Sequence, residues 1–171
     1  MIRIGLLSDT HGFLDVSIET YLKGCDEIWH AGDFGDEKII DQLQEWAPLQ
    51  AVFGNIDSSA VRKRLPETLV LEREGVRLFM RHIIPRPNRY DQALVHEIKH
   101  HQADLVVCGH SHIALVERSA QASVLHLNPG AAGRQGWHTM RTLMRFSLNQ
   151  GEIQQMELIE LGPRLKPSAD R

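Results

Sequence analysis

The chain has 171 residues, of which 42% are hydrophobic and 24% are charged, and its formal net charge is -3. This length fits one folded domain, and the composition excludes disordered, collagen-like and membrane-spanning proteins. The slightly negative charge argues against a protein that binds nucleic acid mainly through its charge. The basic triplet Arg62, Lys63 and Arg64 is therefore interpreted as a solvated helix face.

The first residues and the two cysteines give an expectation about the cellular compartment. The apolar run at 2–7 leaves no room before it for a signal peptide, so we expect a cytoplasmic location. No stretch is long and apolar enough to span a bilayer. Cys25 and Cys108 are too few for a disulfide framework, and we expect both to be reduced.

Strand and helix patterns alternate in the first third of the chain. Apolar runs and apolar stripes at helical spacing predict five elements in order: strand 2–7, helix 14–22, strand 27–30, helix 39–46 and strand 49–53. Each of these strands leads into a polar loop that contains glycine.

The remainder of the chain is richer in strands. The predicted elements are a helix at 58–65, strands at 69–71 and 76–80, a helix at 90–101, strands at 104–108 and 123–127, and a hairpin of strands at 139–148 and 152–161. Early alternation followed by a strand-rich half predicts an α/β fold of two packed β-sheets flanked by helices. We expect one domain over residues 1–162 and a flexible tail over 163–171.

Seven side chains of metal-ligand type lie in five short motifs, most of them at the ends of predicted strands. They are two carboxylates, one amide and four imidazoles: Asp9, His11, Asp33, Asn55, His82, His110 and His112. Loops at the carboxyl ends of strands gather at one edge of an open α/β sheet, so we expect the motifs to converge. In the D-x-H and H-x-H motifs, alternate residues of an extended backbone point the same way and can reach one centre.

This set of side chains is large enough to hold two divalent ions if one group bridges them. Asp33 can bridge, because a carboxylate has two oxygens. Two ions about 3.5 to 4 Å apart can bind a nucleophilic hydroxide and a phosphate oxygen, which is the chemistry of phosphoester hydrolysis. Each motif alone would more often be a cap or a turn, and only the joint occurrence of all five favours a metal site.

In this order the motifs resemble those of the calcineurin-like metallophosphoesterase superfamily, over nearly the whole chain. Those motifs are D-x-H, GD, GN-(H/C)-(D/E), a lone His after a strand, and G-H-x-H. The chain is similar in particular to the short single-domain phosphodiesterases of bacteria and archaea, which also carry the N-P-G motif found here at 128–130. The resemblance implies a four-layer αββα sandwich. It implies one ion held by Asp9, His11, Asp33 and His112, and a second held by Asp33, Asn55, His82 and His110.

The resemblance also implies a reaction and its partners. A metal-bridging hydroxide would attack phosphorus, with Asp33, Asn55 and His110 at the reacting centre. It favours manganese as the metal, whereas the imidazoles also suit zinc, iron and nickel. The expected partner is a small phosphorylated substrate, with nucleic acid disfavoured and no membrane. The oligomeric state stays open.

Two positions depart from the superfamily pattern. Many members have a histidine after the asparagine of the third motif, placed to protonate the leaving oxygen, whereas this chain has Ile56. General acid catalysis contributes about 10² to 10⁴-fold to a rate, so its loss favours phosphodiesters over alkyl monoesters. Ile83 follows His82, where glycine is customary. A competing hypothesis is a catalytically weak or inactive protein of this fold that acts as a binding scaffold.

Other polar residues near the motifs receive supporting or structural roles. His30, Asp57 and Asn128 are candidates for hydrogen bonds that support the ligands from outside. For His30 a satisfied core histidine is an equal alternative, and Asp57 either orients a histidine or shapes its turn. The remaining histidines are interpreted as structural or solvated: His96, His100, His101, His126 and His138.

Overall fold

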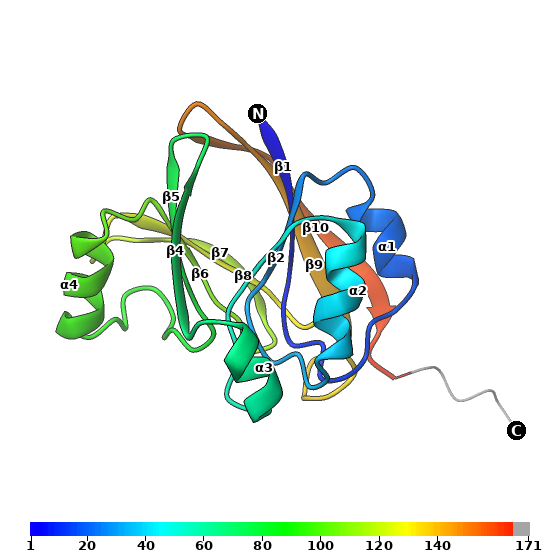
Figure 1. Ribbon diagram of the computed structural model, residues 1–171. Helices are drawn as coiled ribbons and strands as arrows, with labels where there is room; N and C mark the ends of the chain where they lie inside the picture. Colours follow the sequence, from blue (N-terminus) through cyan, green and yellow to red (C-terminus); the bar gives the residue numbers. More distant parts are fainter. Residues whose placement is uncertain (166–171) are drawn as a thin grey trace, which may run out of the picture.

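The computed structural model describes residues 1–165, which form two five-stranded β-sheets packed against each other (Figure 1). The first sheet has the order β10-β9-β1-β2-β3, with bounds Glu152–Pro163, Met140–Asn149, Ile2–Leu7, Glu27–His30 and Leu49–Ala51. The second has the order β4-β5-β6-β8-β7, with bounds Thr68–Arg73, Val76–Arg81, Leu105–Val107, Val124–Pro129 and Ala114–Ser119.

Helices cover the outer faces of both sheets. Helices α1 (Ser17–Leu22) and α2 (Lys38–Trp46) pack on the first sheet, and α4 (Gln92–His100) packs on the second. The short helix α3 (Ser59–Arg64) follows β3. This arrangement confirms the predicted four-layer αββα sandwich. No helix within residues 1–165 is both long and apolar enough to cross a membrane.

Each sheet contains three neighbouring parallel strands. These are β1, β2 and β3 in the first sheet and β5, β6 and β8 in the second. Parallel neighbours need a crossover, which α1, α2 and α4 supply between consecutive strands. The carboxyl ends of these six strands carry all the motifs singled out in the sequence, so the topology brings distant motifs together.

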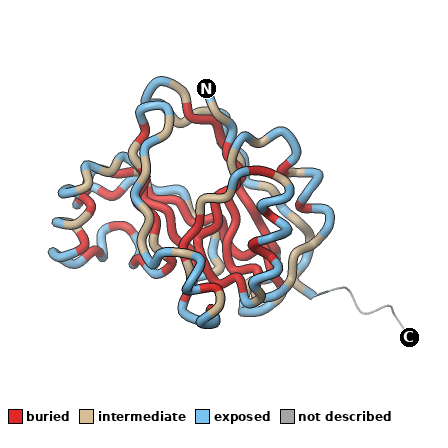
Figure 2. Tube along the Cα trace, in the orientation of Figure 1, coloured by how far each residue is buried: buried red, intermediate tan, exposed pale blue. Residues whose placement is uncertain are grey.

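One apolar core lies between the two sheets, where the strands are buried (red in Figure 2). Trp29 of β2 meets Phe146 of β9 edge to face, with ring centroids 5.6 Å apart. Along β9, Phe146 and Leu148 face this core whereas Leu143 faces the helices, so the two faces of the strand are both buried. Each such buried side chain contributes about 1.5 to 3 kcal/mol. The core therefore fixes the two sheets to each other.

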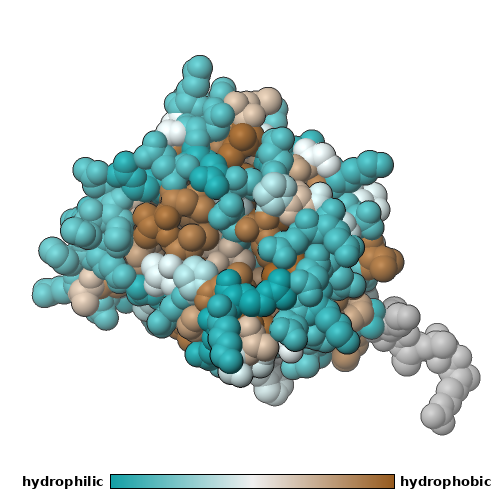
Figure 3. Space-filling model, in the orientation of Figure 1, coloured by the Kyte–Doolittle hydropathy of each residue, from teal (hydrophilic) through white to brown (hydrophobic). Residues whose placement is uncertain are grey.

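Apolar surface remains along one edge of the second sheet. In the view of Figure 3 the surface is mostly hydrophilic, and hydrophobic side chains gather over the edge strand β4. Val70 of this strand is 36% exposed. The sheet edge is thus less covered than the sheet faces.

The structure corrects the sequence prediction at two places. Strand β7 was not predicted, although it pairs with β8 over its whole length. Strand β10 continues to Pro163, which pairs with Met140, so the predicted tail begins inside a strand. The rest of that tail, residues 166–171, lies outside the described residues.

Candidate metal centre

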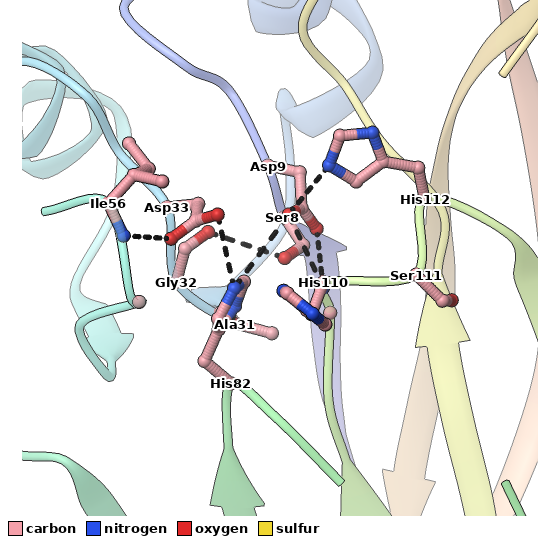
Figure 4. Close-up of polar contacts among 12 residues, drawn as sticks. Ser8, Asp9, Ala31, Gly32, Asp33, Ile56, His82, His110, Ser111 and His112 are labelled. Atoms are coloured by element: carbon pink, nitrogen blue, oxygen red, sulfur yellow. Dashed lines mark hydrogen bonds and ion pairs between the residues drawn. The ribbon is translucent and has the colours of Figure 1, made fainter. Parts of the chain in front are cut away.

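Loops from both sheets converge on one cluster of carboxylates and imidazoles (Figure 4). The potential ligand atoms of Asp9, His11 and His112 lie within 4.8 Å of one another, and the same holds for Asp33, His82 and His110. The chain thus brings six of the seven predicted ligands into two groups of three. The superfamily resemblance divides these six residues in the same way, except that it assigns Asp33 to both ions.

The two groups are in contact with each other. The Nε2 atom of His11 lies 3.8 Å from Asp9 Oδ1 and 3.8 Å from Asp33 Oδ2. Asp9 Oδ1 is also 3.1 Å from His112 Nε2. Burial, as the largest effect, lowers the pKa of His11, and the nearby carboxylates only partly oppose this. A neutral imidazole between two carboxylates is the form that binds a metal ion.

Asn55 lies at the edge of this cluster. It is exposed, and with His82 it lines a cavity of about 240 Å³ beside the two groups. Its backbone carbonyl accepts a hydrogen bond of 3.0 Å from Arg62. The motif that contains Asn55 therefore lies beside the site, at the wall of this cavity.

His82 provides the test of whether this cluster fits a metal. Its Nδ1 atom donates to the carbonyl of Ala31 at 2.7 Å, which leaves the lone pair of Nε2 free. Within residues 1–165, Nε2 is buried without a hydrogen-bond partner, 3.2 Å from Asp33 Oδ2 and 4.0 Å from Asp9 Oδ1. Burial lowers the pKa of His82, but the two carboxylates outweigh it and raise the pKa overall. A cation beside this nitrogen would satisfy it, so the residues fit a divalent metal.

The carboxylate of Asp33 is held in place by the backbone. Its Oδ1 atom accepts a hydrogen bond of 3.1 Å from the amide of Ile56 (Figure 4). Burial raises the pKa of Asp33, but His82 and the Ile56 amide together lower it below the usual value. Asp33 is therefore kept ionised, as a metal ligand must be.

The backbone of the ligands is strained. Five of the seven predicted ligands have a left-handed φ between 48° and 65°: Asp9, His11, Asp33, His110 and His112. Such a conformation costs a residue with a side chain about 1 kcal/mol, and it concentrates at functional sites. The strain is consistent with a site selected for its geometry.

Two glycines make room for the carboxylates. A Cβ at Gly54 would lie 2.0 Å from Asp33 Oδ1, and a Cβ at Gly109 would lie 2.7 Å from Asp9 Oδ2. A side chain at position 54 would displace Asp33, and one at position 109 would displace Ser8 as well as Asp9.

His30 fixes the loops after β1 and β2. It is fully buried, and its Nδ1 atom accepts from the amide of Gly32 at 3.1 Å. Its Nε2 atom therefore carries the proton and lies 3.1 Å from Thr10 Oγ1, which donates to the carbonyl of Phe34. Burial lowers the pKa of His30 to about 3, so the ring is neutral. His30 has no hydrogen bond to a predicted ligand side chain within residues 1–165 and acts through the two loops.

Asp57 shapes the turn of the third motif. It accepts hydrogen bonds from the amides of Gly54 at 2.7 Å and Gly35 at 2.9 Å. The carboxylate thus ties this turn to the loop that carries Asp33. Two roles were predicted for Asp57, and these hydrogen bonds correspond to the second, which is to shape the turn.

Asn128 fixes the loop that carries His110 and His112. Its side-chain nitrogen donates to the carbonyl of Gly109 at 2.7 Å and lies 3.1 Å from Ser111 Oγ. Its side-chain oxygen accepts from the amide of Gly130 at 2.9 Å. The N-P-G motif is therefore part of the framework of the site.

The two departures from the superfamily pattern have clear structural outcomes. The side chain of Ile56 is 47% exposed beside the cluster. Ile83 is 49% exposed and is not among the described residues with positive φ, so this position does not need glycine. The orientation of His82 depends instead on the carbonyl of Ala31.

Arg62 is a functional candidate that the sequence reasoning missed. It was interpreted as part of a solvated helix face, but its guanidinium donates to three backbone carbonyls of the third motif, those of Gly54, Asn55 and Asp57. Its only sequence signal is its place one helical turn after that motif. His138 likewise lies beside the site, with its ring centroid 5.1 Å from that of His112.

Comparisons with known proteins agree with this geometry. A protein from Mycoplasma pneumoniae named a probable metallophosphoesterase is 30% identical over 161 residues, which are 90% of this chain and 94% of that protein. The structure of a novel archaeal phosphodiesterase superposes with a TM-score of 0.71 at 22% identity, covering 94% of this chain and all of that one. Vps29 from Entamoeba histolytica, solved with zinc, gives a TM-score of 0.71 at 18% identity and covers 93% of this chain and 99% of that one.

These two structures share the fold of the chain. A family model described as the calcineurin-like phosphoesterase superfamily domain matches residues 2–151. That span includes all seven predicted ligands and every loop that positions them. The chain belongs to the calcineurin-like phosphoesterase superfamily.

Proposed function

We propose that the chain is a phosphodiesterase that depends on two divalent metal ions. The observation that carries the proposal is the pair of three-residue ligand groups, with His82 Nε2, which has no hydrogen-bond partner among the described residues, beside Asp9 and Asp33. The similarity of the fold to a structure named as an archaeal phosphodiesterase supports it.

The site residues have distinct roles in this reaction. Two bound ions would lower the pKa of water and neutralise charge that develops on the phosphate. The ions would be held by Asp9, His11 and His112 on one side and by Asn55, His82 and His110 on the other, with Asp33 shared. His110 is exposed and lies against His82, with ring centroids 5.3 Å apart. In the proposed reaction His110 contacts a phosphoryl oxygen at the exposed side of the site.

The residue after Asn55 supports a diester substrate. Ile56 cannot give a proton to a leaving oxygen, and its side chain is exposed beside Asp33. An alkyl monoester has a poor leaving group and needs such a proton, whereas an aryl diester does not. We therefore infer an activity directed at phosphodiesters with good leaving groups.

The test is hydrolysis by purified protein with manganese added. Bis(4-nitrophenyl) phosphate should be hydrolysed well above background, and an alkyl phosphomonoester at least about 10²-fold more slowly. The Asp33→Ala variant should lose the diesterase activity. Activity that survives this substitution, or a clear preference for the monoester, would contradict the proposal.

Manganese is the proposed metal, and zinc, iron and nickel are the alternatives for this donor set. The Vps29 structure with zinc is one related fold that holds that ion. Metal analysis of protein purified without added metal, followed by reconstitution with each ion, identifies the one that supports hydrolysis.

A binding scaffold is the second candidate function. It is favoured by apolar side chains exposed near the site, among them Ile56 and Ile113, and by the absence of a proton donor at Ile56. A scaffold without catalysis would bind neither manganese nor zinc, or would bind them without hydrolysing any diester.

A further inference from the structure

A cavity of about 240 Å³ lies directly beside the ligand cluster. Asn55 and His82, which are two of the predicted ligands, form part of its wall, and so do Phe53, Arg62 and Ile83. A phosphoryl group bound at the ligands would therefore place one of its ester groups in this cavity. The residues of the cavity wall then bear on which ester groups are accepted.

The guanidinium of Arg62 is held in a fixed orientation at this wall. Its Nε atom donates to the carbonyl of Asp57 at 2.8 Å, and one Nη atom donates to the carbonyls of Asn55 and Gly54 at 3.0 and 3.2 Å. Its central carbon lies 4.6 Å from the centroid of the Phe53 ring. The planar cation is thus preorganised by the same loop that presents Asn55.

The charge of Arg62 is not neutralised by these contacts. Its hydrogen-bond partners within residues 1–165 are backbone carbonyls, whereas Arg81, the other guanidinium of the cavity, is paired with Glu97 at 2.5 Å. Glu67 adds one exposed carboxylate to the wall. Ile83, which is 49% exposed, adds an apolar surface next to His82. The wall therefore offers a guanidinium that no carboxylate pairs with within residues 1–165, and an apolar side chain.

We propose that this cavity binds a planar aromatic ester group of the substrate, stacked on Arg62 and packed against Ile83. A guanidinium plane binds aromatic faces by cation–π attraction and stacking, and an isoleucine side chain adds apolar contact. The inference rests on the proposed function, because the phosphate of the same substrate occupies the ligand cluster. The ring is either an aryl group attached to the phosphate oxygen or a nucleobase carried on a sugar.

The experiment measures binding of monoesters, which carry a single organic group, by calorimetric titration of manganese-loaded protein. Phenyl phosphate should bind about 5- to 30-fold more tightly than methyl phosphate, because only the phenyl ring can use the cavity. Adenosine 5′-monophosphate and ribose 5-phosphate form the second pair. The pair with the larger preference identifies whether the ring sits directly on the phosphate or on a sugar.

Two variants locate the preference. Arg62→Lys keeps the charge without the plane, and Ile83→Ala removes apolar contact without changing Arg62. Each should reduce the aromatic preference, Arg62→Lys to below about 3-fold. Arg62 also supports Asn55, so its substitution can weaken phosphate binding as a whole. The affinity for the non-aromatic ester measures that loss, and the ratio of the two affinities corrects for it. The matched control is Arg64→Lys on the same helix, where Arg64 pairs with Asp41 outside the cavity.

Equal affinities for the aromatic and non-aromatic esters, or no binding of either, would overturn the subsite. A preference that survives both variants would overturn it as well. The binding assay does not require turnover, so its result is independent of the result of the hydrolysis test. Hydrolysis of an aryl diester without any aromatic preference removes the subsite alone, and a preference without hydrolysis removes the proposed activity alone.

Discussion

Asn128 shows how one side chain outside the predicted ligand set supports the site. It binds the carbonyl of Gly109 and the amide of Gly130 and so holds the loop of His110 and His112. Residues in this position tune a metal site through its ligands. The Asn128→Ala variant should therefore fold normally but bind manganese about 10- to 100-fold more weakly. Calorimetric titration measures this, with Asn149→Ala in the β9–β10 hairpin as a control. An unchanged affinity would show that the loop holds its shape without Asn128.

Gly54 allows a second prediction for a single residue. It does not have a positive φ, so the Gly54→Ala variant tests the contacts of the new Cβ with Asp33, whose Oδ1 would lie 2.0 Å away and whose backbone nitrogen would lie 2.3 Å away. We expect this variant to lose most of its manganese affinity and diesterase activity. Gly24→Ala is the comparison, because its Cβ would meet no atom of residues 1–165 within 4 Å and its cost is backbone strain of about 1 kcal/mol. Equal metal affinity in the two variants would contradict the described position of Asp33.

For individual residues, the sequence predicted which polar side chains form the site but did not predict their hydrogen bonds. The six residues that converge were all recognisable from their motifs, because each follows a strand. The role of Arg62 was not recognisable. Three basic residues in a row on a helix are typical of a solvated surface, and the sequence does not show that one of them contacts the third motif. The same holds for the Ile56 amide, because a backbone donor has no signature in the sequence.

Among the strands of residues 1–165, the edge strand β7 was the one that was not predicted. Strand β7 follows His112 almost directly, and its residues Val116, Glu117 and Arg118 are all exposed, so it lacks the alternation of a half-buried strand. Strand β10 contains two register shifts in its pairing with β9, which interrupt its pattern. The central strands were predicted because burial on both faces makes them continuously apolar.

The contact between β8 and the segment before α4 predicts a pH dependence of stability. His126 is buried, its Nδ1 atom lies 2.6 Å from the hydroxyl of Tyr90, and burial lowers its pKa to about 4 from an ordinary value of 6.5. Below pH 6.5 His126 binds a proton in the unfolded chain but stays neutral in the folded chain. Its contribution to the free energy of unfolding is therefore fully present above that pH and is lost as the pH drops toward 4. The contribution lost between pH 7 and pH 5 is about 2 kcal/mol.

Urea unfolding of metal-free protein at pH 7 and pH 5 measures this contribution. The His126→Gln variant should lose less stability between the two pH values than the wild-type chain does. His96→Gln, which changes an exposed histidine of α4, should behave like the wild type. Equal pH dependence in all three proteins would rule out a buried neutral His126.

At the scale of the whole molecule, the site exists because two sheets pack against each other. The first sheet supplies Asp9, His11 and Asp33, and the second supplies His82, His110 and His112. The core between the sheets, built on residues such as Trp29 and Phe146, holds the two halves in register. Composition and periodicity predicted the layers, but not the strand order, which depends on long-range pairing that no local pattern contains.

The stoichiometry of bound metal tests the central claim most directly. Manganese bound per chain is measured by equilibrium dialysis, for the wild-type chain and for Asp33→Asn, in which the group shared between the two ligand sets is weakened. The two groups of ligands predict two ions per wild-type chain at saturation and no more than one in the variant. A wild-type chain that saturates at one ion, or binds none, would contradict a two-metal site.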